Sequence, residues 1–188
     1  MTQQIQDKLI YENQEFYLNR ELVEEYFREF PEKRLEFTVS CTALWRGYIA
    51  EFEVKNNELY INKLDVLGDI NFNMKSVRNE IFPKNKFEWY SGLIRIDDFR
   101  GEFDSEPENG LFEYLEIVEG NLIQKRTYNY LELQEFKKEQ YEYFLMSEEV
   151  ENLYHFWRKN NETGIINREN VNKIILENIM DYTRKVYV

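Results

Sequence analysis

The side chains best suited to bind a ligand lie in two short segments of the sequence. Trp45, Arg46 and Tyr48 fall within four positions, and Trp89 and Arg95 follow in a second segment. Aromatic rings stack on flat ligands, and a guanidinium group pairs with anions. These five residues are therefore candidates for a ligand pocket lined by aromatic and arginine side chains.

A structural role is the alternative for the first segment. Gly47 allows a strand to bend or bulge, and Arg46 shares the strand parity of Tyr48, Phe52 and Val54. A guanidinium group on that buried face keeps its charge, so it needs carboxylate or carbonyl partners within the chain. We expect this structural role for Arg46.

Residues for nucleophilic or metal-dependent catalysis are scarce. The chain holds one cysteine, Cys41, and one histidine, His155, far apart in sequence. One cysteine excludes an intrachain disulfide and a CxxC motif, and one histidine excludes a multi-histidine metal site. No GxSxG, P-loop, GxGxxG or HExxH motif is present. We name no catalytic residue, expect no cofactor and no tightly bound transition metal, and lean toward a protein that is not an enzyme.

Two acidic segments have the residue types of a site for a hard cation. The segment from Asp69 to Glu80 resembles a calcium-binding loop, but Met74 occupies the sixth position, where the sharp turn requires glycine. Residues 97–110 are also rich in carboxylates. We expect both to be solvated loops without a bound ion.

The charge of the chain is strongly negative and unevenly distributed. The net charge is −12, and residues 102–151 carry 14 Asp and Glu against 4 Lys and Arg, a net charge of −10. This charge argues against a nucleic-acid partner and against docking on anionic lipid. It favours a basic protein partner, with tyrosines interleaved among the acids as interface residues. The alternative is an ordinary solvated surface.

The first two thirds of the chain read as hairpins around one helix. Residues 8–18 predict a hairpin with Asn13 and Gln14 as its loop, which would pair Leu9 with Leu18. Residues 51–62 predict another, with its loop at positions 56 and 57. Between them an apolar stripe of helical period predicts a helix over 22–30, capped by Asn19 and ended by Pro31. A strand is expected at 87–96, and a further hairpin over 111–128 with its turn near residues 119–121.

The period becomes helical from about residue 131. One helix is marked by Leu133 and Phe144, a second by Val150 and Trp157, and a third by a stripe from Val171 to Tyr182 that includes Ile174 and Ile175. Strands followed by helices predict an α+β fold with a mostly antiparallel sheet. We expect a single domain over residues 1–188, with a hairpin-rich sheet and one helix in 1–128 and a helical segment packed on it in 129–188.

The segments with the Trp-Arg-Gly-Tyr-Ile-Ala string resemble an uncharacterised family of small bacterial proteins. The resemblance rests on residues 9–18, 42–61 and 89–96, the last of which reads WYSGLIRI. It implies an N-terminal hairpin and helix followed by a two-stranded ribbon. The family has no established activity, so the resemblance implies no catalytic residue. Where the family continues with a Pro-Gln-Gly step, this chain has Asp97, Asp98 and Phe99.

Three functions remain open on the sequence. The first is a non-enzymatic, acidic binding or inhibitory protein similar to toxin-immunity proteins. The second is a small-ligand-binding protein or enzyme that uses the aromatic and arginine pocket, and the third is a structural subunit of an oligomer. The sequence has no secretory signal and no apolar run near the ~20 residues of a membrane span, so we expect a cytoplasmic protein without a membrane partner.

Overall fold

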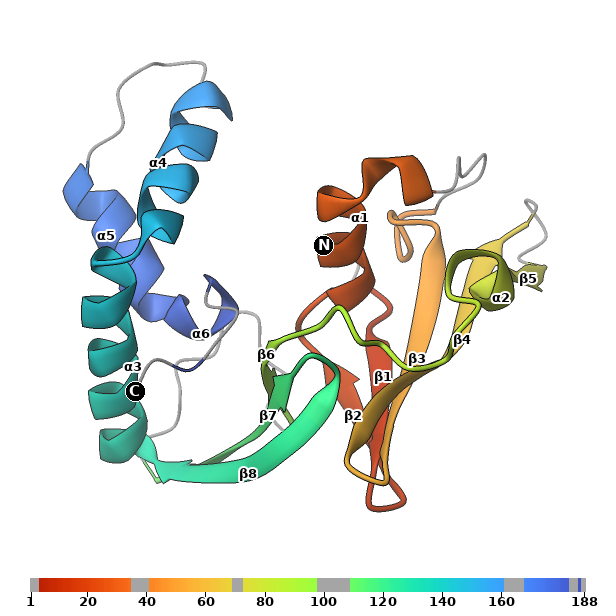
Figure 1. The fold of residues 1–188 in the computed structure, drawn as a ribbon, viewed down its shortest axis with the longest axis horizontal. Coiled ribbons are helices and arrows are strands. Elements are labelled where there is room, and N and C mark those ends of the chain that lie inside the picture. The colour runs from red at the N-terminus through yellow and green to blue at the C-terminus, as the bar shows by residue number, and fades with distance from the viewer. Residues whose placement is uncertain are drawn as a thin grey trace.

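The fold is an α+β arrangement with a mostly antiparallel sheet, as the sequence predicted (Figure 1). This computed structural model describes residues 4–34, 41–68, 73–97, 109–160, 168–182 and 186, without the side chains of 156–160, 168, 170 and 182. The strands are β1 (Asp7–Tyr11), β2 (Gln14–Leu18), β3 (Tyr48–Lys55), β4 (Glu58–Leu67), β5 (Met74–Ser76), β6 (Gly92–Arg95), β7 (Leu111–Val118) and β8 (Asn121–Asn129). Within the described residues they form one sheet in the order β2-β1-β3-β4-β8-β7-β6, with β5 added to β4.

The first hairpin differs from the predicted one in its loop. Glu12 and Asn13, with φ of 51° and 62°, form the turn, whereas Asn13 and Gln14 were expected. The register is therefore Leu9 opposite Phe16, and the predicted pairing of Leu9 with Leu18 is wrong. A two-residue turn of this kind needs positive φ at both positions, and Asn13 meets that need at the second one. The error shifts the register by two residues, so the same side chains still face the core.

The second hairpin confirms its predicted register. Asn56 and Asn57 have φ of 52° and 59°, and Val54 lies opposite Leu59. The inward side chains of β3 and β4 are buried, while Glu51 and Glu53 on the other face are half-buried. The hairpin is joined to β1 by parallel pairing of β1 with β3, which is the one parallel pair among the described strands.

The sheet bends sharply where β4 pairs with β8. Their ladder consists of one pair, Glu58 with Asn121. Around it, the N–H of Leu59 donates to the carbonyl of Gly120 at 2.8 Å, and the N–H of Gly120 donates to the carbonyl of Tyr90 at 2.8 Å. Beyond this point β8 curves away toward the C-terminal helices (Figure 1). Gly120 thus lies where three segments meet.

Replacing Gly120 with alanine is expected to destabilise the protein by about 2 kcal/mol or more. Its φ of +70° is unfavourable for a side chain, and an added Cβ would lie 2.7 Å from the carbonyl oxygen of Phe87. Urea denaturation measures the loss. Asn57→Ala is the control, because it has a similar positive φ in an exposed turn. Equal losses in the two variants would show that backbone strain alone matters and that the close approach does not.

The N-terminal helix α1 (Leu22–Glu29) covers the first hydrophobic core. Leu22, Val23 and Phe27 are buried in it. The expected cap is wrong: Glu21 occupies the N-cap position, and the side-chain oxygen of Asn19 accepts a hydrogen bond from Gln6. The helix ends just before Pro31, as predicted. The short helices η1 (Pro31–Lys33) and α2 (Arg78–Ile81) follow along the chain.

A second core lies among the C-terminal helices. These are α3 (Tyr130–Leu145), α4 (Glu148–Asn160), α5 (Arg168–Glu177) and α6 (Ile179–Tyr182). Val171, Ile175 and Ile179 are buried in this core, as the predicted stripe requires. Ile174 is not: its side chain is 44% exposed. Because α5 ends at Glu177 and α6 begins at Ile179, the third predicted helix is two helices.

Strands β6 and β7 serve both cores through alternate residues. Ile94 and Leu115 belong to the first core, whereas Leu93, Phe112 and Tyr114 belong to the second. Side chains alternate between the two faces of a strand, so a strand buried on both faces joins two cores. The predicted strand over 87–96 is shorter than expected, because only 92–95 pair with β7. Within the described residues, no helix is long and apolar enough to cross a bilayer.

Candidate functional site

The turn before β3 positions Trp45 and Arg46 on opposite sides. The N–H of Leu44 donates to the carbonyl of Cys41 at 2.9 Å, and the N–H of Gly47 donates to the carbonyl of Leu44 at 3.1 Å. Gly47 has a φ of 76°, which lets the chain leave this turn directly into the strand. As a result Arg46 points into the protein, whereas the side chain of Trp45 is 55% exposed.

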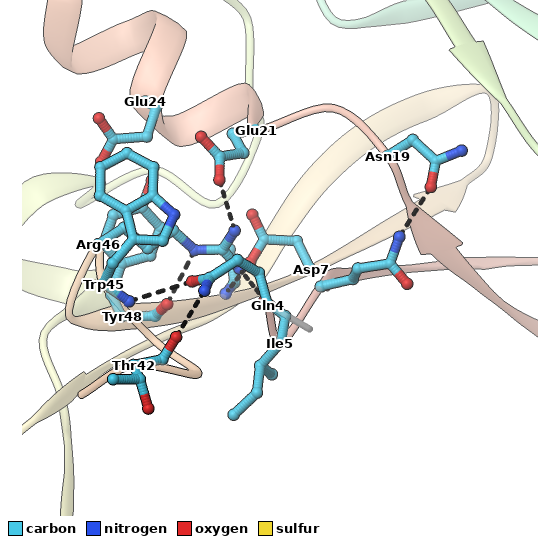
Figure 2. A network of polar contacts seen from close by, with 12 residues as sticks. Gln4, Ile5, Asp7, Asn19, Glu21, Glu24, Thr42, Trp45, Arg46 and Tyr48 are labelled. Atoms are coloured by element: carbon cyan, nitrogen blue, oxygen red, sulfur yellow. Dashed lines mark hydrogen bonds and ion pairs between the residues drawn. The ribbon is translucent and has the colours of Figure 1, made fainter. Parts of the chain in front are cut away.

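The guanidinium group of Arg46 is buried and bound on every side by this chain (Figure 2). It donates to the Asp7 carboxylate at 2.7 Å and to the Glu21 carboxylate at 3.0 Å. It also donates to the carbonyl oxygens of Ile5 at 2.8 Å and Tyr48 at 3.1 Å. These contacts join the N-terminal segment, β1, α1 and β3 at one point. The contacts support the structural role expected for Arg46.

Asp7 is the buried carboxylate of this network. One oxygen accepts hydrogen bonds from Arg46 and from the N–H of Ala50 at 2.8 Å, while the other is buried and has no hydrogen-bond partner among the described residues. Burial raises the pKa of Asp7 to about 6, against the lowering effect of Arg46. Arg46 is shared with Glu21, and the carboxylates of Glu21 and Glu24 further raise this pKa.

Asp7 is expected to make the protein more stable as the pH falls from 7 to 4. In the unfolded chain an aspartate titrates near ~3.9, so between that pH and about 6 only the folded state holds the proton. The stability from this group is thus complete below pH ~4 and is lost as the pH rises through about 6.

Urea denaturation of wild type and Asp7→Asn over this pH range isolates the effect. The wild-type free energy of unfolding minus that of the variant should rise on acidification by on the order of 3 kcal/mol. A difference that is constant or falls would contradict the raised pKa of Asp7.

Tyr48 and Trp45 have different surroundings although they are close in sequence. Tyr48 is fully buried, its ring lies 5.3 Å from the Arg46 guanidinium, and burial raises the pKa of its phenol. Trp45 is held through its backbone, because its N–H donates to the side chain of Gln4 at 3.2 Å. Among Trp45, Arg46 and Tyr48, only Trp45 exposes a large side-chain surface to solvent.

Trp89 and Arg95 occupy other places in the fold. Trp89 packs its ring against Tyr26 of α1, with centroids 5.5 Å apart, and is part of the first core. Arg95 pairs with Asp97 at 2.7 Å and lies over the ring of Phe112, 5.2 Å from its centroid. Both candidate arginines therefore have a carboxylate partner from this chain, which favours structural roles over anion binding.

Arg20 is a connecting residue that local sequence patterns do not reveal. Its guanidinium group pairs with Glu25 at 2.5 Å and lies over the ring of Tyr90, with 5.6 Å to the centroid. It also donates to the carbonyl oxygens of Leu93, Met180 and Asp181. One side chain thereby joins the segment before α1 to β6 and α6. A lone arginine between a hairpin and a helix gives no sequence signal for such distant partners.

Helix α3 has an exposed side opposite its buried one. Leu133 and Phe144 are buried in the second core. Successive residues are 100° apart around a helix axis, and the side opposite the buried one is a stripe about 100° wide. Along the helix axis this stripe has apolar residues at both ends and charged residues between them. All its members are exposed: Leu131, Glu135, Lys138, Glu142, Leu145 and Met146. We call these six residues the α3 face. Among the described residues, neither Glu135 nor Glu142 forms an ion pair.

The remaining candidate groups do not gather into a site within the described structure. No group of His, Cys, Asp and Glu suited to hold a metal ion occurs in that part of the chain. Cys41 is half-buried in the turn before Arg46, and His155 is exposed on α4. In the calcium-loop-like segment, only residues 69–72 lie outside the described structure; Met74 lies in β5, and Glu80 lies in α2 and pairs with Lys75 at 3.7 Å. The acidic segment 97–110 lies largely outside the described residues.

Comparisons of the chain with protein-family models, with curated proteins and with solved structures gave no match. The resemblance to a family with a Trp-Arg-Gly-Tyr-Ile-Ala string therefore stays a prediction.

Proposed function

We propose that the protein is a non-enzymatic binding protein whose acidic C-terminal half docks a basic protein partner. One concrete form is an inhibitor that covers a basic protein in the bacterial cytoplasm, similar to acidic immunity proteins. The observation that carries the proposal is the α3 face, where exposed apolar residues flank carboxylates that have no ion-pair partner in the described chain.

The apolar residues of the α3 face are exposed to solvent. Met146 is 83% exposed, and Leu131 and Leu145 are also among the exposed large hydrophobic residues. On the α3 face, Leu131 lies at one end and Leu145 and Met146 lie at the other, with the charged residues between them, and exposed apolar side chains next to charges occur at protein interaction sites. A partner that covered them would bury apolar area, which is the dominant favourable term in association.

The negative charge around the α3 face indicates the charge of the partner. Residues 102–151 have a net charge of −10, and Glu135 and Glu142 place two of these acids on the α3 face, on either side of Lys138. A field of one sign speeds encounter with a protein of opposite charge and suppresses partners of like charge. The complementary partner surface is therefore basic.

Reversing the charge of the α3 face tests the proposal. We expect wild type, used as bait in an extract of the source cells, to retain a basic protein at low salt and to release it at high salt. Glu135→Lys with Glu142→Lys should abolish that retention, because like charges across an interface cost several kcal/mol.

A matched control variant has the same change in net charge, so that only the position of the changed residues differs. Glu32→Lys with Glu88→Lys makes the same change at two exposed positions outside the acidic segment and should retain the partner. Retention that both double variants lose equally would show that total charge, not the α3 face, governs binding. Two results would contradict the proposal: retention of an acidic protein, or the absence of any retained protein whose binding is lost with Glu135→Lys and Glu142→Lys.

A further inference from the structure

Five residues of the α3 face lie on two lines of positions seven residues apart, one with leucine at both ends and lysine in the middle, and one with two glutamates. Leu131, Lys138 and Leu145 are seven apart, and so are Glu135 and Glu142. All five are exposed on one helix that runs without interruption over Tyr130–Leu145. A seven-residue repeat of side chains on a helix surface is the pattern that a second, nearly parallel or antiparallel helix packs against.

We infer that the element of the partner that docks on the α3 face is a basic amphipathic helix laid along α3. The inference rests on the proposed function, which supplies a basic partner, and adds the shape and residue order of the contact. Leucine or another apolar residue would face Leu131 and Leu145, an acidic residue would face Lys138, and basic residues would face Glu135 and Glu142.

The dimensions of the stripe favour a helix over an extended segment. At ~1.5 Å per residue, the stripe runs ~21 Å from Leu131 to Leu145, and the two carboxylates are ~10 Å apart along the axis. A helix crossing at ~20° stays in contact over that length, with its own side chains at the same spacing. An extended strand advances ~3.3 Å per residue, so its side chains fall out of step with the stripe after about two contacts.

The α3 helix is fixed from its other side, so the α3 face is preorganised. Leu133 and Phe144 are buried in the second core, and α5 and α6 lie beside α3 (Figure 1). At its start the Asn129 side chain accepts from the N–H of Glu132, and the Glu132 carboxylate accepts from the N–H of Asn129. This capping box holds the first turn, next to Leu131. A rigid docking surface lowers the entropy cost of binding.

Three synthetic peptides test the inference directly. The first carries Leu, Lys, Glu, Lys and Leu at positions 1, 5, 8, 12 and 15, which is the stripe with its charges reversed, and has lysines on its outer side. The second has the same composition with those five positions scrambled. The third equals the first except for two prolines at outer positions, which break the helix. Fluorescence anisotropy with the full-length protein at physiological salt measures binding.

We expect the first peptide to bind at least about tenfold more tightly than the other two. Leu131→Ala with Leu145→Ala should remove that preference, whereas Ile123→Ala, at an exposed position of β8, should keep it. Equal binding of all three peptides, with Glu135 and Glu142 still required, would overturn the helical partner and leave the proposed basic partner standing. Binding of none of them would overturn both.

Discussion

Arg46→Met is expected to lower the free energy of unfolding by about 3–5 kcal/mol. The substitution keeps most of the volume but removes the charge that faces two carboxylates, Asp7 and Glu21, at 2.7 and 3.0 Å. Asp7 would then be a buried carboxylate without a cationic partner in this network. Chemical denaturation at pH 7 measures the loss.

Lys63→Met is the matched control for Arg46→Met. Lys63 also pairs with a carboxylate, Glu51 at 2.8 Å, but its side chain is exposed. Exposed ion pairs contribute about 0–1 kcal/mol, so this variant should unfold close to wild type. If Arg46→Met were equally stable, the buried network would not hold the fold, and Trp45, Arg46 and Tyr48 would become the first candidates for a ligand site.

Ile175→Asp is expected to cost about 4 kcal/mol or more, enough to unfold the second core. Ile175 is fully buried in the second core, so the change removes apolar burial and places a carboxylate among apolar side chains. Circular dichroism should show loss of helical signal, and the melting temperature should fall.

The neighbouring residue provides an internal control for the helix. Ile174→Asp makes the same chemical change one position away, where the side chain is 44% exposed rather than 0% as at Ile175. Because the two changes have the same helix propensity cost, their difference reports burial alone. Similar melting temperatures for the two variants would show that α5 is peripheral to the fold.

Local patterns were sufficient for much of the fold. Alternation over 51–62 predicts both the loop and the register of β3 and β4, because one face must be buried and two asparagines suit the turn. The same reasoning misplaces the β1–β2 loop by one residue. Glu12 adopts a positive φ, which glutamate rarely does. Asn13 fits either a turn at residues 12 and 13 or one at residues 13 and 14, so it does not distinguish them.

The contacts between distant segments lay beyond local patterns. The parity of Arg46 predicts that it is buried with carboxylates, but not that Asp7 and Glu21 supply them. Arg20 meets carbonyl groups about 160 positions away, and no spacing rule connects them. The sequence predicts an acidic C-terminal half, yet the α3 face emerges only once the buried side of the helix is known.

Site-specific photocrosslinking is the most direct test of the proposal that a basic protein partner covers the α3 face. A benzophenone amino acid would replace Met146, which is 83% exposed, or as control Met74 on β5, which is 41% exposed. After irradiation in the source cells, the Met146 variant is expected to crosslink one protein through a segment of net positive charge, and the Met74 variant is not. The same products from both positions, no discrete product at Met146, or a crosslinked segment of net negative charge would contradict a basic partner on this face.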